Sequence, residues 1–221
     1  MVLSWAQLER HLGTARLAHY MDQCNGNQTQ AIALYRWNAS LSAAFWLDLG
    51  HLEVAFRNAL DIRMAMRSAE RGGETDWLAD PRRELGRDAV RAGRHRQPYT
   101  DIHTARGRVR NNQKPSTHDQ IISETSFGRW HQLVSRSQMF LWPDLAGVFP
   151  FSPDRAQPTI ADPVSRLRHF RNPIAHHHRI WSMDGVARYQ DILAVAGYID
   201  PDLSDWIDDA SSVRGLLDEQ P

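Results

Sequence analysis

QTQAIALYRWNASLSAAFWLDLGHLEVAFRNALDIRMAMRSAER, residues 28–71, contains no Pro and has Gly50 as its only Gly. Apolar side chains recur along it at steps of three and four residues, the spacing of one face of an α-helix. We therefore predict one very long helix, or two helices in line with a bend near Gly50. The apolar positions are Ile32, Tyr35, Ala39, Leu41, Phe45, Leu49, Leu52, Phe56, Leu60 and Met64.

Helix signals continue on both sides of this segment. Residues 4–24 carry apolar side chains close to helical spacing, and two further helices are predicted over 184–199 and 203–217. Asp162 and Pro163 suit the cap and the first position of another helix. No run of alternating residues argues for a sheet, and no internal repeat is present. The sequence therefore predicts an all-α fold, a bundle of four or five helices.

Two segments interrupt this bundle pattern. Between Pro81 and Lys114 there are nine Arg and one Lys against three acids, so residues 81–114 are predicted to be a basic insertion of short helices and loops. Residues 142–162 hold a series of prolines and are predicted to be mostly loop. A chain of 221 residues can bury the core of one domain, so 1–221 is taken as a single domain.

Composition limits the class of protein. The hydrophobic fraction of 42% predicts a packed globular chain. Cys24 is the only cysteine, which excludes an intrachain disulfide and a cysteine-based metal site. The first residues lack the basic start and apolar stretch of a signal peptide, and no apolar run approaches the roughly 20 residues that cross a bilayer. We expect a cytoplasmic protein with no membrane association.

The segment that carries reactive groups is RHFRNPIAHHH, residues 168–178. Pro173 disfavours helical geometry at Asn172, so we predict that a new helix begins there, with Arg171 just before it and His176 near its first turn. The free amides and positive dipole of a helix N-terminus favour a phosphate and disfavour a protonated imidazole. A neutral His can accept a proton, and Arg can stabilise negative charge on phosphorus. This arrangement predicts a phosphotransfer site that needs no metal.

Three plainer interpretations compete with this one. An Arg and a His five residues apart occur commonly by chance. The three consecutive histidines could bind a metal, although successive helical residues point about 100° apart and do not converge on one ion. Arg168 and Arg171 could also belong to an ordinary solvated face.

The spacing from Arg171 to His176 resembles the Arg-polar-x-x-x-His signature of the HEPN ribonucleases, and its flanks resemble the Abi-like branch of that superfamily, with His177 completing a histidine pair. Three further blocks resemble the same branch in the same order, so that the resemblance covers most of residues 5–210. These blocks are Leu34-Tyr-Arg-Trp-Asn38 with Leu41-Ser42, Leu52-Glu-Val-Ala-Phe-Arg-Asn-Ala59, and Ser126-Phe-Gly-Arg-Trp-His-Gln-Leu133.

The resemblance implies a HEPN-type helical bundle that dimerises, with the motif of each subunit lining one cleft. It also implies a role in bacterial phage defence by abortive infection. Many relatives are metal-independent endoribonucleases, and others only bind RNA or a partner. The chain departs from the family at His178, where Glu is frequent, and at Pro173 inside the motif.

Glu53, Arg57 and Asn58 allow two interpretations. Glu53 and Arg57 are four residues apart and could form an ordinary helix ion pair worth a few tenths of a kcal/mol. The family likeness instead places these residues beside the motif, where they hold the guanidinium of Arg171. Elsewhere on the long helix Trp37 and Trp46 are expected in the core, and the same is expected of Trp130.

The leading functional prediction is an endoribonuclease without metal or other cofactor. His176 acts as base on a ribose 2′-hydroxyl, Arg171 stabilises the phosphorane, and Asn172 orients the substrate or the Arg, which leaves a 2′,3′-cyclic phosphate. The basic insertion is predicted to contact RNA phosphates. The arginines proposed for these contacts are Arg91, Arg94, Arg96, Arg106, Arg108 and Arg110.

A homodimer is predicted from the chemistry. Cleavage benefits from a base and an acid, one chain holds a single Arg-x-x-x-x-His set, and His177 and His178 would point away from His176 on a regular helix. Two alternatives stay open. The chain could be a non-catalytic RNA-binding module, or a toxin whose surface is blocked by an antitoxin protein or small RNA.

Overall fold

The computed structural model describes residues 3–73 and 76–221, and the secondary-structure elements of this part of the chain are all helices, without a β-strand. The prediction of an all-α fold is confirmed. Within the described residues no helix combines the length and the apolar character of a membrane span. The α-helices are α1 (Trp5–Leu12), α2 (Thr14–Gln23), α3 (Gln28–Glu70), α4 (Gln97–Asn111), α5 (His118–Ser123), α6 (Phe127–Val134), α7 (Trp142–Leu145), α8 (Gln157–Ala175), α9 (Gly185–Ile199), α10 (Pro201–Ala210) and α11 (Val213–Asp218), and the 3-10 helices are η1 (Trp77–Ala79), η2 (Arg136–Leu141) and η3 (Ala146–Val148).

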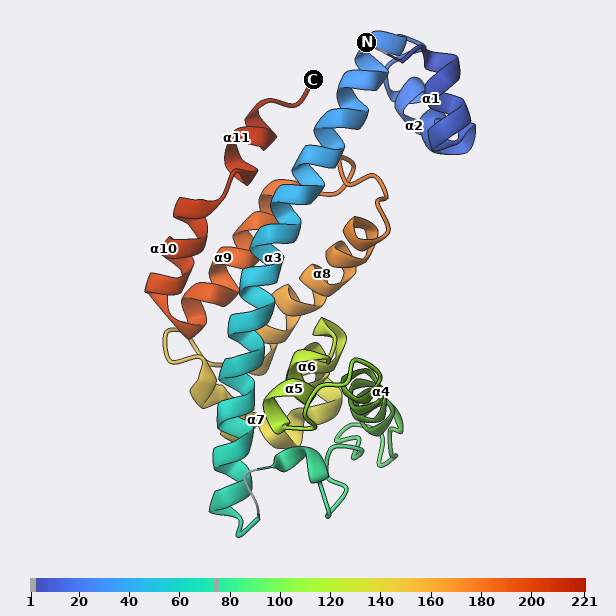
Figure 1. Cartoon of the computed structure of the whole chain (residues 1–221). Coiled ribbons are helices and arrows are strands. Elements are labelled where there is room, and N and C mark those ends of the chain that lie inside the picture. Colours follow the sequence, from blue (N-terminus) through green and yellow to red (C-terminus); the bar gives the residue numbers. More distant parts are fainter. Residues whose placement is uncertain (1–2, 74–75) are drawn as a thin grey trace.

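Helix α3 is the long central helix of the molecule (Figure 1). It is one continuous helix of 43 residues that runs through Gly50, and at 1.5 Å per residue it is roughly 65 Å long. Asn27 caps it, because its side chain accepts a hydrogen bond from the backbone N–H of Gln30 at 3.2 Å. The helix ends at Arg71, beyond which Gly72 adopts a positive φ of 72°.

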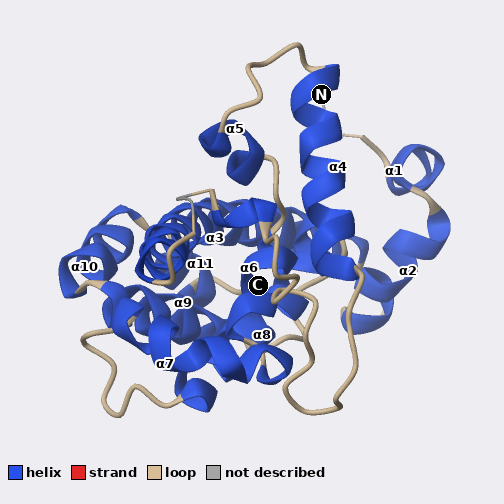
Figure 2. Ribbon diagram, turned by 90° about the horizontal axis from the view of Figure 1, so that it is seen from below, coloured by secondary structure: helices blue, strands red, loops and turns tan. Residues whose placement is uncertain are grey.

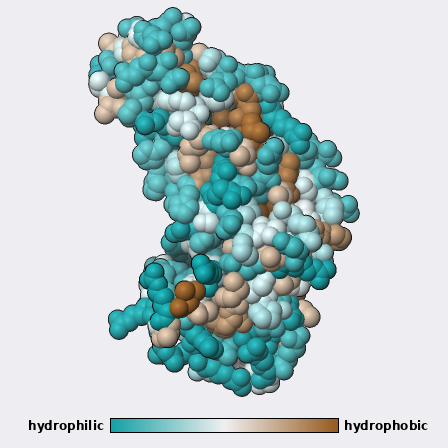
Figure 3. All heavy atoms as spheres, turned by 180° about the vertical axis from the view of Figure 1, so that it is seen from behind, coloured by the Kyte–Doolittle hydropathy of each residue, from teal (hydrophilic) through white to brown (hydrophobic). Residues whose placement is uncertain are grey.

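The core lies where α8, α9 and α11 pack against the buried face of α3 (Figure 1). Phe45 of α3 is fully buried, and its ring meets Phe170 of α8 edge to face at 4.8 Å. Helix α10 folds back along α9. Figure 3 shows that the face opposite that of Figure 1 is mostly hydrophilic, with apolar surface in small separate patches.

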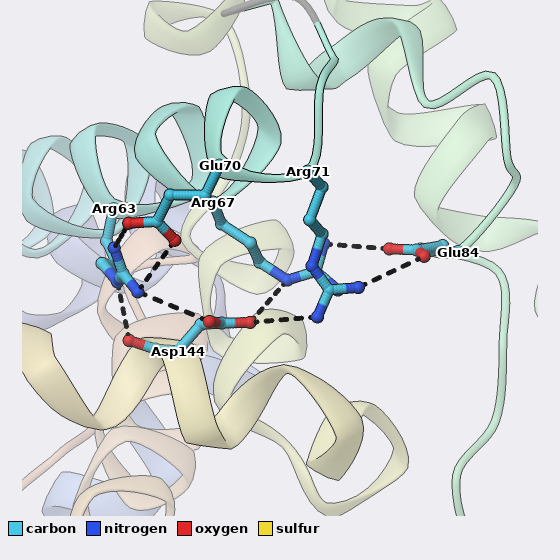
Figure 4. A network of polar contacts seen from close by, with 6 residues as sticks. All are labelled: Arg63, Arg67, Glu70, Arg71, Glu84 and Asp144. Carbon is cyan, nitrogen blue, oxygen red and sulfur yellow. Dashed lines mark hydrogen bonds and ion pairs between the residues drawn. The ribbon is translucent and has the colours of Figure 1, made fainter.

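An ion-pair network links the C-terminal end of α3 to α7 and to Glu84 (Figure 4). Arg67 is buried, and its guanidinium pairs with Asp144 of α7 at 2.7 Å and with Glu84 at 2.9 Å. Arg63 adds pairs to Asp144 at 3.4 Å and to Glu70 at 3.1 Å. Glu84 thus links the basic insertion to the bundle, and the insertion's helix α4 lies beside α5 (Figure 2) with Ile102, Ala105 and Val109 buried in the core.

Helix α8 corrects two predictions. It begins at Gln157 rather than at Asp162, and it continues through Pro163 and Pro173 to Ala175 without a break. A proline inside a helix costs about 3 kcal/mol. Between the prolines the buried side chains of Val164, Leu167 and Phe170 each contribute roughly 1.5–3 kcal/mol, so tertiary packing outweighs the local preference.

The segment 142–162 is also more helical than predicted. It contains α7, η3 and the first turns of α8, and the irregular part is confined to residues 149–156. Pro143 and Pro158 lie at the second positions of α7 and α8, within the first turn, where a missing N–H breaks no hydrogen bond. These prolines start helices instead of marking a loop.

Candidate functional site

The predicted motif lies at the C-terminal end of α8, not at a helix N-terminus. His176 is the C-cap, and His177 takes a left-handed backbone with φ of 53°. The N–H of His178 donates to the carbonyl of Pro173 at 2.8 Å, and that of His177 donates to Ile174 at 3.0 Å. This pair of hydrogen bonds is the Schellman ending of a helix.

This position reverses the electrostatic prediction for the site. A helix C-terminus presents carbonyl oxygens and the negative end of the dipole, which favour a cation. The backbone of α8 therefore supplies no amides for a phosphate. An anion bound here must be held by side chains.

The turn after α8 is held by two other helices. Asn38 of α3 is buried, and its Oδ1 accepts from the N–H of Ile180 at 2.8 Å while its Nδ2 donates to the carbonyl of His178 at 3.5 Å. Arg16 of α2 donates to the carbonyl of His177. The three histidines thus sit on a turn that is fixed from both sides.

An open hollow of about 450 Å³, here named the histidine hollow, lies on the surface of this turn. It is lined by Asn172, Pro173, His176, His178 and Arg179. The rings of His176 and His178 lie 6.1 Å apart between centroids, at an angle of 74°. The expectation that His178 points away from His176 was wrong, because the helix ends between them and the left-handed residue at 177 turns the chain back.

Arg171 lies beside this hollow but does not line it. Its Nε is 3.3 Å from a carboxylate oxygen of Glu53 on α3, and its guanidinium carbon is 4.8 Å from the ring centroid of Trp46. Glu53 does contact Arg171, as the family likeness suggested. The Nε of Arg57 donates instead to the side-chain oxygen of Asn58 at 3.4 Å. Among the described residues no ion pair joins Glu53 to Arg57.

Trp46 is the clearest correction among the aromatic residues. Its side chain is 45% exposed, whereas Trp37 and Trp130 are buried as predicted. Trp46 lies on α3 next to the buried Phe45, so a change of one position along the helix moves the side chain from the core to the surface. An exposed Trp under an arginine is available for a ligand.

Two residues near this site were not singled out from the sequence: Arg179, which lines the hollow, and Arg16, which reaches the same turn from α2. A third, His178, had been set aside as pointing away from His176, and it lines the hollow as well. The run of histidines marked the region, but the turn that gathers them depends on backbone hydrogen bonds that no spacing rule reveals.

The six arginines of the basic insertion that are proposed for RNA contact are all exposed. Three precede α4 and three lie on it, where Arg108 also donates to the carbonyl of Glu124 at 3.0 Å. In Figure 1 helix α4 lies toward the end of α3 that carries Glu70, whereas the end of α8 lies toward α2. The insertion is therefore a second basic surface, separate from the histidine hollow.

Comparisons of the chain with protein-family models, with curated proteins and with solved structures find no match. The likeness to the Abi-like branch of the HEPN superfamily stays a prediction that rests on the motifs. The described residues contain no group of three His, Cys, Asp or Glu side chains that could hold a metal ion.

Proposed function

We propose that the chain is a cytoplasmic, metal-independent endoribonuclease of the Abi-like HEPN type, active in bacterial phage defence. The observation that supports it is the histidine hollow, where His176 and His178 face one open space together with Arg179 and Asn172. Two imidazoles, one guanidinium and one amide supply a base, an acid, a counter-charge and a polar group for orientation.

In the proposed reaction His176 accepts the proton of a ribose 2′-hydroxyl as the 2′-oxygen attacks the adjacent phosphorus. The bond from phosphorus to the 5′-oxygen of the next nucleotide breaks, and protonated His178 gives its proton to that oxygen. The products are a 2′,3′-cyclic phosphate and a 5′-hydroxyl, so atoms and protons balance without an added reactant. General acid–base steps of this kind typically contribute about a hundred- to ten-thousand-fold to a rate.

The two arginines take different roles. Arg179 lines the hollow, so we assign it to the negative charge that grows on the phosphorane. Arg171 is held by Glu53 and Trp46 outside the hollow, and we assign it to a neighbouring phosphate of the same RNA strand. Asn172 orients the ribose or the phosphate.

The homodimer stays a prediction, but the chemical argument for it, that one chain lacks a second imidazole for the reaction, is weaker than the sequence indicated. His178 offers the second imidazole within the same chain, so one subunit holds both groups that the reaction uses. Sedimentation at assay concentration measures the subunit number independently of cleavage.

The first test is incubation of purified protein with total RNA in excess EDTA. Wild type is expected to cleave, and His176→Ala is expected to lose at least about a hundred-fold in rate. His11→Ala, which removes an exposed histidine from α1, is the matched control and should keep full activity. RNA binding without cleavage by wild type would favour the non-catalytic module instead, and recovery of activity only with a specific metal would contradict the mechanism.

A further inference from the structure

A second cavity of about 580 Å³ lies directly behind the histidine hollow, between α2, α3 and the end of α8. His178 lines both spaces. We name this space the aromatic cavity, because three of its walls are aromatic rings. The lining residues that bear on a ligand are Tyr20, Tyr35, Ala39, Ala43, Trp46 and His178.

The shape of the aromatic cavity follows from the order of residues on α3. Tyr35 and Trp46 stand at its two ends, and the small side chains of Ala39 and Ala43 between them leave the space open. Tyr20 of α2 closes one side, with its ring 5.1 Å from that of Tyr35 in an edge-to-face contact. A flat aromatic ligand can therefore stack on ring faces and lie over small side chains.

The rim of this cavity is positively charged. Arg16 of α2 and Arg179 line an adjoining depression together with Tyr20 and His178, and Arg171 covers the ring of Trp46. Burial raises the pKa of Tyr20 to about 12, although Arg16 and Arg179 oppose this effect, so its hydroxyl stays neutral at physiological pH. An aromatic interior beneath a basic rim suits a base that is attached to a phosphate.

We propose that the aromatic cavity binds one unpaired nucleobase of single-stranded RNA, stacked on Trp46, and so sets the nucleotide whose phosphate enters the histidine hollow. The proposal rests on the proposed function and names its substrate as unpaired RNA. A base within a duplex is stacked between its neighbours and cannot enter a side pocket, whereas the bases of loops and single strands can stack on aromatic side chains.

The test separates binding from cleavage. A fluorescent single strand of 2′-O-methyl RNA has no free 2′-hydroxyl, so it reports binding alone by anisotropy, and the same strand annealed to its complement is the duplex probe. Trp46→Ala is expected to weaken single-strand binding about ten-fold, the scale of one lost stack, and Trp46→Phe to retain most of it. Trp206→Ala, which removes a Trp of α10 that is 54% exposed, is the matched control and should bind as wild type.

A second variant acts on the cavity without removing the ring beneath Arg171. Ala43→Leu fills the space that a base would take, and Ala69→Leu places the same side chain at an exposed position of α3 outside the cavity. Ala43→Leu should weaken binding by a similar factor while Ala69→Leu should not. Equal melting temperatures of the two variants show that folding is not the cause.

The outcomes distinguish this proposal from the proposed function. His176→Ala should bind the 2′-O-methyl strand like wild type and yet fail to cleave RNA. Binding that depends on Trp46 and Ala43 in a protein that never cleaves would support the cavity and refute the ribonuclease. Two results would overturn the cavity proposal without affecting the proposed ribonuclease. One is a protein that cleaves RNA but binds it equally well with and without the substitutions at Trp46 and Ala43. The other is equal binding of the duplex and the single strand.

Discussion

The imidazole rings of His176 and His178 lie 6.1 Å apart and nearly perpendicular, although only one residue separates them in the chain. On a continuous helix two such residues point about 200° apart. They come together because α8 ends at Ala175 and His177 adopts a left-handed backbone. The pairing of the two imidazole rings is therefore a product of how the helix ends.

The backbone at His177 gives a stability prediction. A side chain in the left-handed region carries steric strain that Gly does not. We expect His177→Gly to raise the free energy of unfolding by roughly 0.5–1 kcal/mol, and His177→Val, with its branched side chain, to lower it. Urea denaturation measures both. If Val is tolerated as well as Gly, residue 177 is not held left-handed in solution.

The hydrogen bonds between Asn38 and the turn after α8 predict a larger loss of stability. Asn38→Ala leaves the buried N–H of Ile180 without its acceptor, which costs about 1–3 kcal/mol. Cleavage should fall as well, because the turn that carries the histidines is no longer fixed from α3. Asn58→Ala is the control on the same helix, since Asn58 is exposed and its removal should cost less than about 0.5 kcal/mol. Similar losses of stability in the two variants would show that the hydrogen bonds of Asn38 do not hold this turn.

The basic insertion predicts a change in salt dependence. Replacement of the six arginines proposed for RNA contact by Gln should weaken RNA binding and flatten the slope of log K against log salt, since each phosphate contact adds to that slope. Folding should change little, because these side chains are exposed and the hydrogen bond from Arg108 to the carbonyl of Glu124 lies at the surface. An unchanged slope would identify the insertion as ordinary surface. The substitutions are at Arg91, Arg94, Arg96, Arg106, Arg108 and Arg110.

His131 predicts how stability depends on pH. Burial, followed by the positive charges of Arg168 and His169, lowers its pKa from 6.5 to about 4. Between these values the unfolded chain binds a proton that the folded chain does not, so this residue makes the free energy of unfolding fall as the pH falls from 6.5 toward 4.

The measurement compares urea denaturation at about pH 7 and about pH 4.5. His131→Gln should lose less stability over this range than wild type, and His103→Gln, at an exposed position of α4, should lose as much as wild type. An identical pH dependence of His131→Gln and wild type would show that His131 does not remain neutral in the folded state.

The sequence predicted those features that depend on periodicity. The apolar spacing of residues 28–71 identified the segment that forms α3, and the absence of alternating segments indicated an all-α fold. Local rules failed at Pro173, where the packing of Phe170 and Ile174 against the bundle carries the helix past the proline. A single sequence does not show how much a tertiary contact will offset a local cost.

The candidate site was predicted in part. The motif located Arg171, Asn172 and His176, and the family likeness placed Glu53 beside Arg171. The roles proposed for the two arginines and for His178 differ from those expected from the sequence, because the site lies at the end of a helix and not at its start. His178 joined His176 through a turn set by Asn38, which lies 140 residues away in the chain, and no local pattern could reveal that contact.

The most direct test of the account uses an RNA strand that is 2′-O-methylated except at one ribonucleotide, incubated in EDTA with identification of the new ends. We predict that wild type and the control variant His11→Ala produce a 2′,3′-cyclic phosphate and a 5′-hydroxyl, and that His176→Ala and His178→Ala are each slower by at least about a hundred-fold. Full activity of His178→Ala, or a 3′-hydroxyl in place of the cyclic phosphate, would contradict the claim that these two histidines act as base and acid.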